Sequence, residues 1–138
     1  MFSVSTSIQT DRTADALGEI ARELHDIGGA RPVTARELDL FRRGEVLTLP
    51  DRFETNNAMV SYLRYVTRFE HPYAWITTLP DRYAAATPEV VTSTAAAMLH
   101  PDAMTWVVVG DLSKIEAGVR ALGLGEVQVW DAEGARLR

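Results

Sequence analysis

The decisive stretch of this sequence is Met104-Thr105-Trp106-Val107-Val108-Val109-Gly110-Asp111. It is short and rich in β-branched side chains, with Pro101 and Asp102 before it and a glycine near its end. Such a run is typical of a strand that is covered on both faces rather than of a helix. The stretch therefore predicts one buried strand, with the rest of the chain packed around it.

Two further segments alternate between apolar and polar side chains, as half-buried strands do. The first spans residues 2–10, where Phe2, Val4 and Ile8 share one side, and the second spans Glu126–Trp130. A strand that begins at residue 2 has neither a turn nor a cap before it. We interpret this start as a sign that the chain is part of a longer protein.

Helical periodicity and helix-start signals account for most of the remaining sequence. The most specific signals are the capping box of Thr34 with Glu37 and the start at Thr87-Pro88-Glu89, and a second capping box is predicted at Ser113-Lys114-Ile115-Glu116. The expected helices lie at about 14–27, 35–47, 58–69, 73–79, 88–100 and 113–122.

This order of elements predicts an α+β fold in a single domain, residues 1–138. The expected architecture has two layers, with a small, mainly antiparallel sheet covered by helices on one face. The sheet is expected to be incomplete towards the N-terminus, because a central strand needs more neighbours than the two other segments supply.

Composition narrows the classes of function and location. The formal net charge of −5 and the isoelectric point of about 5.1 leave no basic face of the kind that binds nucleic acid. The absence of cysteine excludes disulfides and thiolate metal sites. No apolar stretch approaches the length of a membrane span, and no signal peptide is visible, so the location stays unknown.

No catalytic or metal-binding constellation stands out among the polar residues. The turn Gly110-Asp111 before a helix resembles a phosphate site only weakly, and we interpret it as a turn into a capped helix. His25, His71 and His100 occupy separate segments and are interpreted as structural or solvated. Two acidic pairs are interpreted as surface charges: Asp39 with Glu45, and Asp111 with Glu116. The sequence therefore assigns no catalytic, metal-binding or substrate-binding residue.

An aromatic group remains as a candidate binding feature. Its members are Tyr62, Tyr65, Phe69, Tyr73, Trp75 and Tyr83. Aromatic side chains can line a groove for an extended peptide, because they offer large contact area at low entropic cost. Their helical spacing favours the other interpretation, that they belong to the core.

Four short motifs, in order along the chain, resemble the insulinase/pitrilysin family of zinc metallopeptidases. They are Thr13-Ala14-Asp15-Ala16-Leu17, Val33-Thr34-Ala35-Arg36-Glu37-Leu38, Thr87-Pro88-Glu89-Val90-Val91 and Val107-Val108-Val109-Gly110-Asp111. The similarity covers nearly the whole chain and is to the C-terminal half-domain of such enzymes, which include processing-peptidase-like proteins.

The resemblance implies a non-catalytic role for this chain. In the family, the N-terminal half carries the His-x-x-Glu-His zinc motif, which this sequence lacks, while the second half forms chamber wall and substrate contacts. No functional residue of the family falls on a position in this sequence. The expected partners are a peptide substrate or the catalytic half, the zinc is expected in that half, and exported bacterial relatives point to the periplasm.

A different class of function stays open beside this one. The chain would then be a free-standing protein-interaction module that recruits its partner through an unpaired strand edge or through the aromatic group. Unpaired strand edges also pair with a second copy of themselves, so a homodimer is a further expectation.

Overall fold

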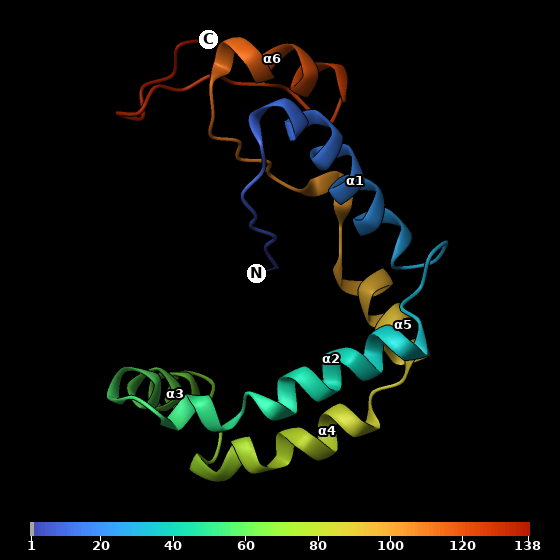
Figure 1. The fold of residues 1–138 in the computed structure, drawn as a ribbon, viewed down its shortest axis with the longest axis vertical. Coiled ribbons are helices and arrows are strands. Elements are labelled where there is room, and N and C mark those ends of the chain that lie inside the picture. Colours follow the sequence, from blue (N-terminus) through green and yellow to red (C-terminus); the bar gives the residue numbers. More distant parts are fainter. Residues whose placement is uncertain (1) are drawn as a thin grey trace. The chain divides into compact units, whose positions relative to one another are not determined.

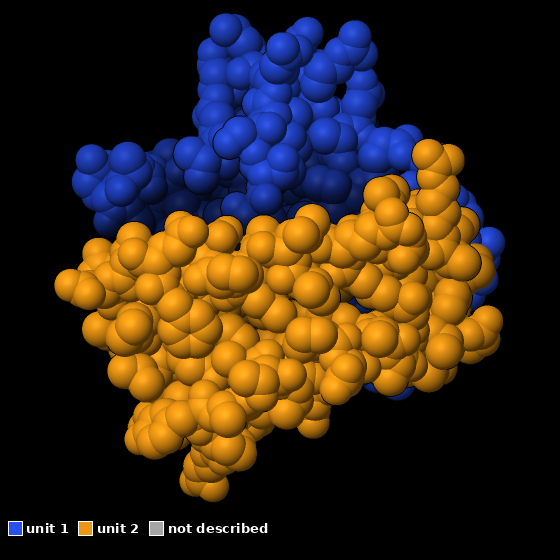
Figure 2. All heavy atoms as spheres, turned by 60° about the horizontal axis from the view of Figure 1, so that its bottom comes forward, with its two compact units in different colours: residues 1–31, 96–138 blue, residues 32–95 orange. Residues whose placement is uncertain are grey.

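The computed structural model describes residues 2–138, and regular structure in this range is helical (Figure 1). The α-helices are α1 (Thr13–Asp26), α2 (Ala35–Leu47), α3 (Asn56–Arg68), α4 (Leu79–Ala85), α5 (Pro88–Met98) and α6 (Leu112–Ala121). Short 3₁₀ helices lie between them: η1 (Thr10–Arg12), η2 (Pro50–Phe53), η3 (Tyr73–Thr78) and η4 (Pro101–Ala103). The chain divides into two compact units, residues 2–31 with 96–138 and residues 32–95 (Figure 2).

The predicted α+β fold with an antiparallel sheet is wrong. Within residues 2–138 there are six α-helices and no sheet, and the one strand-like pairing is an isolated antiparallel bridge between Trp130 and Arg136. A strand is stable only when its backbone N–H and C=O groups pair with a neighbour, which periodicity within one segment cannot supply. Residues 2–9 alternate like a strand and residues 104–109 have the composition of one, but neither segment forms a strand pairing with any part of residues 2–138.

The prediction that the stretch from Met104 to Asp111 is buried is also wrong. Met104, Trp106 and Val108 are half-buried, whereas Val107 and Val109 are 83% and 94% exposed. The third predicted strand folds back locally on the C-terminal residues: Leu137 donates its backbone N–H to the carbonyl of Val129 over 2.8 Å. None of the three predicted strands therefore lies inside a sheet.

In the first unit, α1 packs against α6 at very short range. Leu17, Ala21 and Ile115 supply the buried apolar side chains of this contact region. A Cβ added at Gly118 of α6 would lie 2.9 Å from the Cβ of Ala14 in α1. The two helices approach this closely because the position on α6 has no side chain.

In the second unit, a small core joins α3 to the segment that follows it. The buried residues are Tyr62, Val66, Ile76 and Leu79, with Leu49, Trp75 and Tyr83 partly buried against them. The hydroxyl of Tyr62 donates to the carbonyl of Tyr73 over 2.6 Å and accepts the N–H of Ile76 over 3.2 Å. The tyrosine thus fixes η3 on α3 by polar as well as apolar contacts.

Helix ends follow the local sequence closely. The predicted capping box of Thr34 and Glu37 is confirmed, with bonds in both directions, and Thr87 accepts the N–H of Val90 at the start of α5. The predicted capping box at Ser113-Lys114-Ile115-Glu116 is wrong. Asp111 caps α6 instead, because its carboxylate accepts the N–H of Ser113 over 3.1 Å.

Candidate protein-binding site

Residues 104–110 of the first unit have an extended sequence with several exposed side chains, and we call them the open strand segment. Even-numbered side chains from Met104 to Val108 turn inwards, and Thr105, Val107 and Val109 are exposed. No backbone hydrogen bond involves residues 105–109 within the described chain, residues 2–138. The segment combines unpaired backbone groups with a bare β-branched face, which is the combination that pairs with another strand.

The aromatic group predicted from the sequence divides between core and surface. Tyr62 is buried, and Trp75 and Tyr83 pack half-buried against the same core, as the core interpretation requires. Tyr65, Phe69 and Tyr73 are exposed. Helical spacing alone could not separate the two sets, because the neighbouring η3 segment decides which side of α3 is covered.

A tight helix end brings part of this group together. After α3, Glu70 adopts the left-handed conformation with φ of 54°, and the N–H of His71 reaches the carbonyl of Val66 over 2.8 Å. This is the hydrogen-bond pattern of a Schellman turn. It places the His71 ring parallel to Trp75, with 4.6 Å between ring centroids and 8° between planes.

The exposed aromatics extend from this stack. The ring of Tyr65 lies 4.9 Å from Phe69 and 5.4 Å from Trp75, centroid to centroid. Two guanidinium groups lie near the rings, Arg68 at 5.7 Å from Phe69 and Arg82 at 5.8 Å from Trp75, within the range of cation–π attraction. These arginines were not predicted from the sequence, although Arg68 directly precedes Phe69 and Arg82 follows Trp75 by seven residues.

The three histidines remain apart from one another. His25 is near the end of α1, 3.4 Å from a carboxylate oxygen of the exposed Asp102, while His71 belongs to the aromatic stack and His100 precedes η4. Within residues 2–138 no group of three histidine, aspartate or glutamate side chains lies close enough together to hold a metal ion.

The acidic pairs singled out in the sequence are not paired in space as reactive carboxylates. Asp39 forms an ion pair with Arg43 over 2.5 Å, and Glu45 accepts the hydroxyl of Tyr83 over 3.4 Å. Burial, followed by the charge of Glu45, raises the pKa of the Tyr83 phenol. The ion pair lies within α2, and the bond between Tyr83 and Glu45 joins α4 to α2 within the second unit.

The other acidic pair organises α6. A hydrogen bond from Ser113, reinforced by Lys114, lowers the pKa of the Asp111 carboxyl, in keeping with its role as a cap. Arg138 and then Arg120 lower the pKa of Glu116, whose carboxylate lies 2.5 Å and 2.9 Å from their guanidinium nitrogens. Both acids are ionised partners of structural bonds near neutral pH.

Comparison with family models, curated proteins and solved structures found no match to this chain. No helix in the described range, residues 2–138, combines the length and the apolar character needed to cross a bilayer. The open strand segment and the exposed aromatic side chains are the features that suggest a function.

Proposed function

We propose that this chain performs no catalysis of its own and binds another polypeptide by strand pairing at the open strand segment. The observation that carries the proposal is the state of Val107 and Val109, which are 83% and 94% exposed on a backbone without hydrogen bonds. A partner strand supplies the missing backbone bonds and covers both side chains at once. Strand addition therefore gives hydrogen-bond partners to the free backbone groups and removes Val107 and Val109 from water.

The first candidate for the partner is the catalytic half of a zinc metalloendopeptidase-like protein. The four ordered motifs that resemble the insulinase/pitrilysin family support this choice. In such an assembly the chain contributes chamber wall and packing for a peptide substrate, and the zinc belongs to the other half. Because this sequence contains no His-x-x-Glu-His, peptide hydrolysis is assigned to the assembly and not to this chain.

The test begins with the genomic sequence upstream of residue 1. A continuous reading frame with a zinc motif defines the partner polypeptide, which is then purified and mixed with this chain. We expect peptide hydrolysis from the mixture and none from the chain alone, even with added zinc. Hydrolysis by the chain alone, or stoichiometric zinc bound to it, would contradict the non-catalytic role.

Two matched variants test whether the partner binds at the open strand segment. Val109→Asp puts a charge on the open strand segment and is expected to abolish binding of the partner. Leu47→Asp puts the same charge on an apolar side chain of α2 that is 77% exposed and is expected to leave binding unchanged. Slower backbone hydrogen exchange at residues 105–109 in the complex is the direct sign of strand pairing; unchanged exchange there would refute it.

A second copy of this chain is the alternative partner, in the free-standing interaction module. The same exposed valines favour it, because two copies of an unpaired strand edge can pair with each other. The molar mass measured by light scattering over a range of concentrations shows whether two copies of the chain associate. A dimer that dissociates on dilution and is lost in Val109→Asp supports the module, and a monomer at every concentration excludes it.

A further inference from the structure

We propose that a second surface, on α3, binds an acidic amphipathic helix of a partner protein. The surface consists of Val60, Leu63, Arg64, Thr67 and Arg68, and we call it the α3 face. It shares no residue with the open strand segment and does not depend on the function proposed for that segment.

The α3 face is a continuous exposed side of one helix. Helical spacing of three and four residues places its members next to one another, opposite the buried Tyr62 and Val66. Val60 is 53% exposed and Leu63 is 42% exposed. A shallow and widely open depression of about 650 Å³ lies along this side, lined by α3 and the residue that follows it, and includes Tyr65 and Phe69. An apolar surface in a depression of this kind suits the apolar side chains of another helix.

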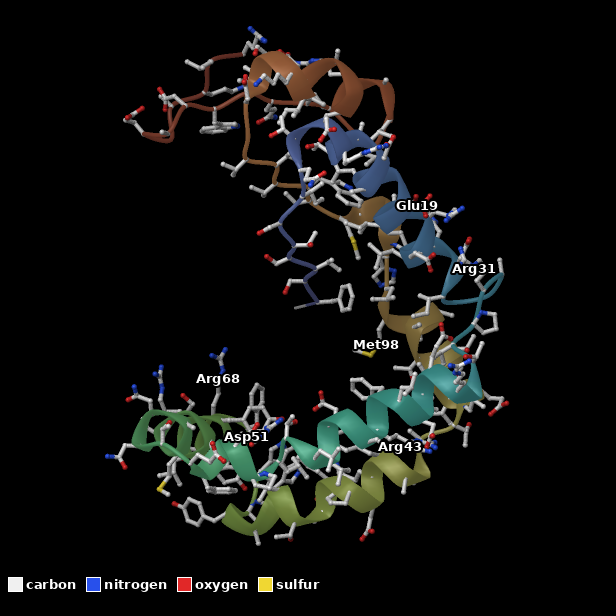
Figure 3. All side chains as sticks on the ribbon, in the orientation of Figure 1. Glu19, Arg31, Arg43, Asp51, Arg68 and Met98 are labelled. Carbon is white, nitrogen blue, oxygen red and sulfur yellow. The ribbon has the colours of Figure 1, made fainter. Side chains whose placement is uncertain are left out.

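The arginines of the α3 face differ from the arginines and lysine of the first unit. Like Arg36, Arg52 and Arg82 of the second unit, they have no carboxylate within ion-pair distance among residues 2–138. Every arginine and lysine of the described part of the first unit lies within ion-pair distance of a carboxylate, as Arg22 does with Glu19. By contrast, neither Arg64 nor Arg68 has a carboxylate partner within residues 2–138, and α3 itself contains no acidic residue. In Figure 3 the Arg68 side chain projects away from α3.

Arg64 and Arg68 lie one helical turn apart, and neither has a carboxylate partner within residues 2–138. A partner with negative charge therefore fits this surface. In a protein with a net charge of −5, these two arginines form a local positive strip between aliphatic side chains on one edge and aromatic side chains on the other. Two carboxylates one turn apart on a facing helix match this strip, and apolar side chains beside them match its edges. The net charge of −5 opposes the approach of a phosphate backbone, which favours a protein partner over single-stranded nucleic acid.

Fluorescence polarisation with a designed peptide tests the proposal on the full chain. The probe is a labelled amphipathic helix with leucines on one side and glutamates beside them. Its matched control carries lysine in place of each glutamate, and a labelled single-stranded oligothymidylate reports nucleic-acid binding. We expect the glutamate peptide to bind at least about tenfold more tightly than the lysine peptide, since close charge pairs dominate the difference.

Single charge reversals locate the binding surface. Arg64→Glu is expected to weaken the glutamate peptide at least about tenfold and to favour the lysine peptide, because the local charge is inverted. Arg36→Glu changes the net charge identically at an exposed position of α2 and is expected to have less than about a twofold effect. Both variants are checked for unchanged helix content by circular dichroism.

Three results would overturn the proposal. The first is equal affinity for the two peptides, and the second is an equal loss of affinity in Arg64→Glu and Arg36→Glu. The third is tighter binding of the oligothymidylate than of the glutamate peptide, lost in Arg64→Glu, which would make the α3 face a nucleic-acid site.

Discussion

Gly118 of α6 faces Ala14 of α1 at a distance that leaves no room for a methyl group. A Cβ built at Gly118 lies 2.9 Å from the Cβ of Ala14, and both atoms are bonded directly to helical backbone, so neither can move aside by a side-chain rotation. The contact of the two helices in the first unit thus requires glycine at this position.

Gly118→Ala is therefore expected to destabilise the first unit by about 1–3 kcal/mol, as overpacking does in well-packed contacts. Gly44→Ala is the control: nothing lies within 4 Å of a Cβ at this position of α2, so alanine is expected to stabilise by about 0.5–1 kcal/mol. Urea unfolding measures both. In the double variant Ala14→Gly with Gly118→Ala, part of the loss is expected to return; strictly additive effects would show that the two positions are not in contact.

Tyr62→Phe removes a buried hydroxyl that has two backbone partners. The carbonyl of Tyr73 and the N–H of Ile76 then lose their bonds, so the second unit is expected to lose about 1–3 kcal/mol of stability. Tyr73→Phe removes a hydroxyl from an exposed ring and is expected to change stability little. Thermal unfolding measures the stability of both variants. Similar effects of the two would show that the hydrogen bonds of the Tyr62 hydroxyl do not contribute to stability.

Glu70→Gly is expected to stabilise the protein. Glu70 has a φ of 54°, where a side chain costs about 1–2 kcal/mol and glycine costs much less. Glu70→Ala removes the same carboxylate but keeps a Cβ, so it separates the backbone effect from the charge effect. If alanine stabilises as much as glycine, the gain comes from charge and the left-handed turn is not its source. Thermal unfolding is the measurement.

Acid is expected to weaken the attachment of the C-terminal residues to α6. Arg138 and Arg120 lower the pKa of Glu116 in the folded chain below its value in the unfolded chain. The ionised carboxylate therefore contributes stability above the ordinary glutamate pKa of about 4.3, and this contribution is lost as pH falls through the lowered pKa of the folded state.

The measurement is stability against pH for the natural chain and for Glu116→Gln. The variant is expected to be less stable at neutral pH and to show a shallower decline below about pH 4.3, because its amide does not titrate. Arg138→Ala is expected to bring the pKa of Glu116, followed by NMR, back towards its ordinary value. Identical pH profiles for the natural chain and Glu116→Gln would rule out this contribution.

Local chemistry in the sequence was sufficient for five of the six α-helices of the described residues and for several of their ends. The helix predicted at 73–79 is the 3₁₀ helix η3 instead, and α4 (Leu79–Ala85) was not predicted. Thr34 with Glu37, and Thr87 with Pro88, form caps from residues within four positions of each other, so no distant part of the chain is needed. The interpretation of Gly110-Asp111 as a turn into a capped helix is confirmed for the same reason, with Asp111 as the cap.

Only the tertiary structure decided what depends on contacts between distant segments. Residues 104–109 carry the composition of a buried strand, yet whether they are buried depends on neighbouring strands that their own sequence does not contain. Tyr62 and Tyr65 have the same helical context, but η3 covers the first and leaves the second exposed. Periodicity determines which side chains share a face, and packing against other segments determines which face is buried.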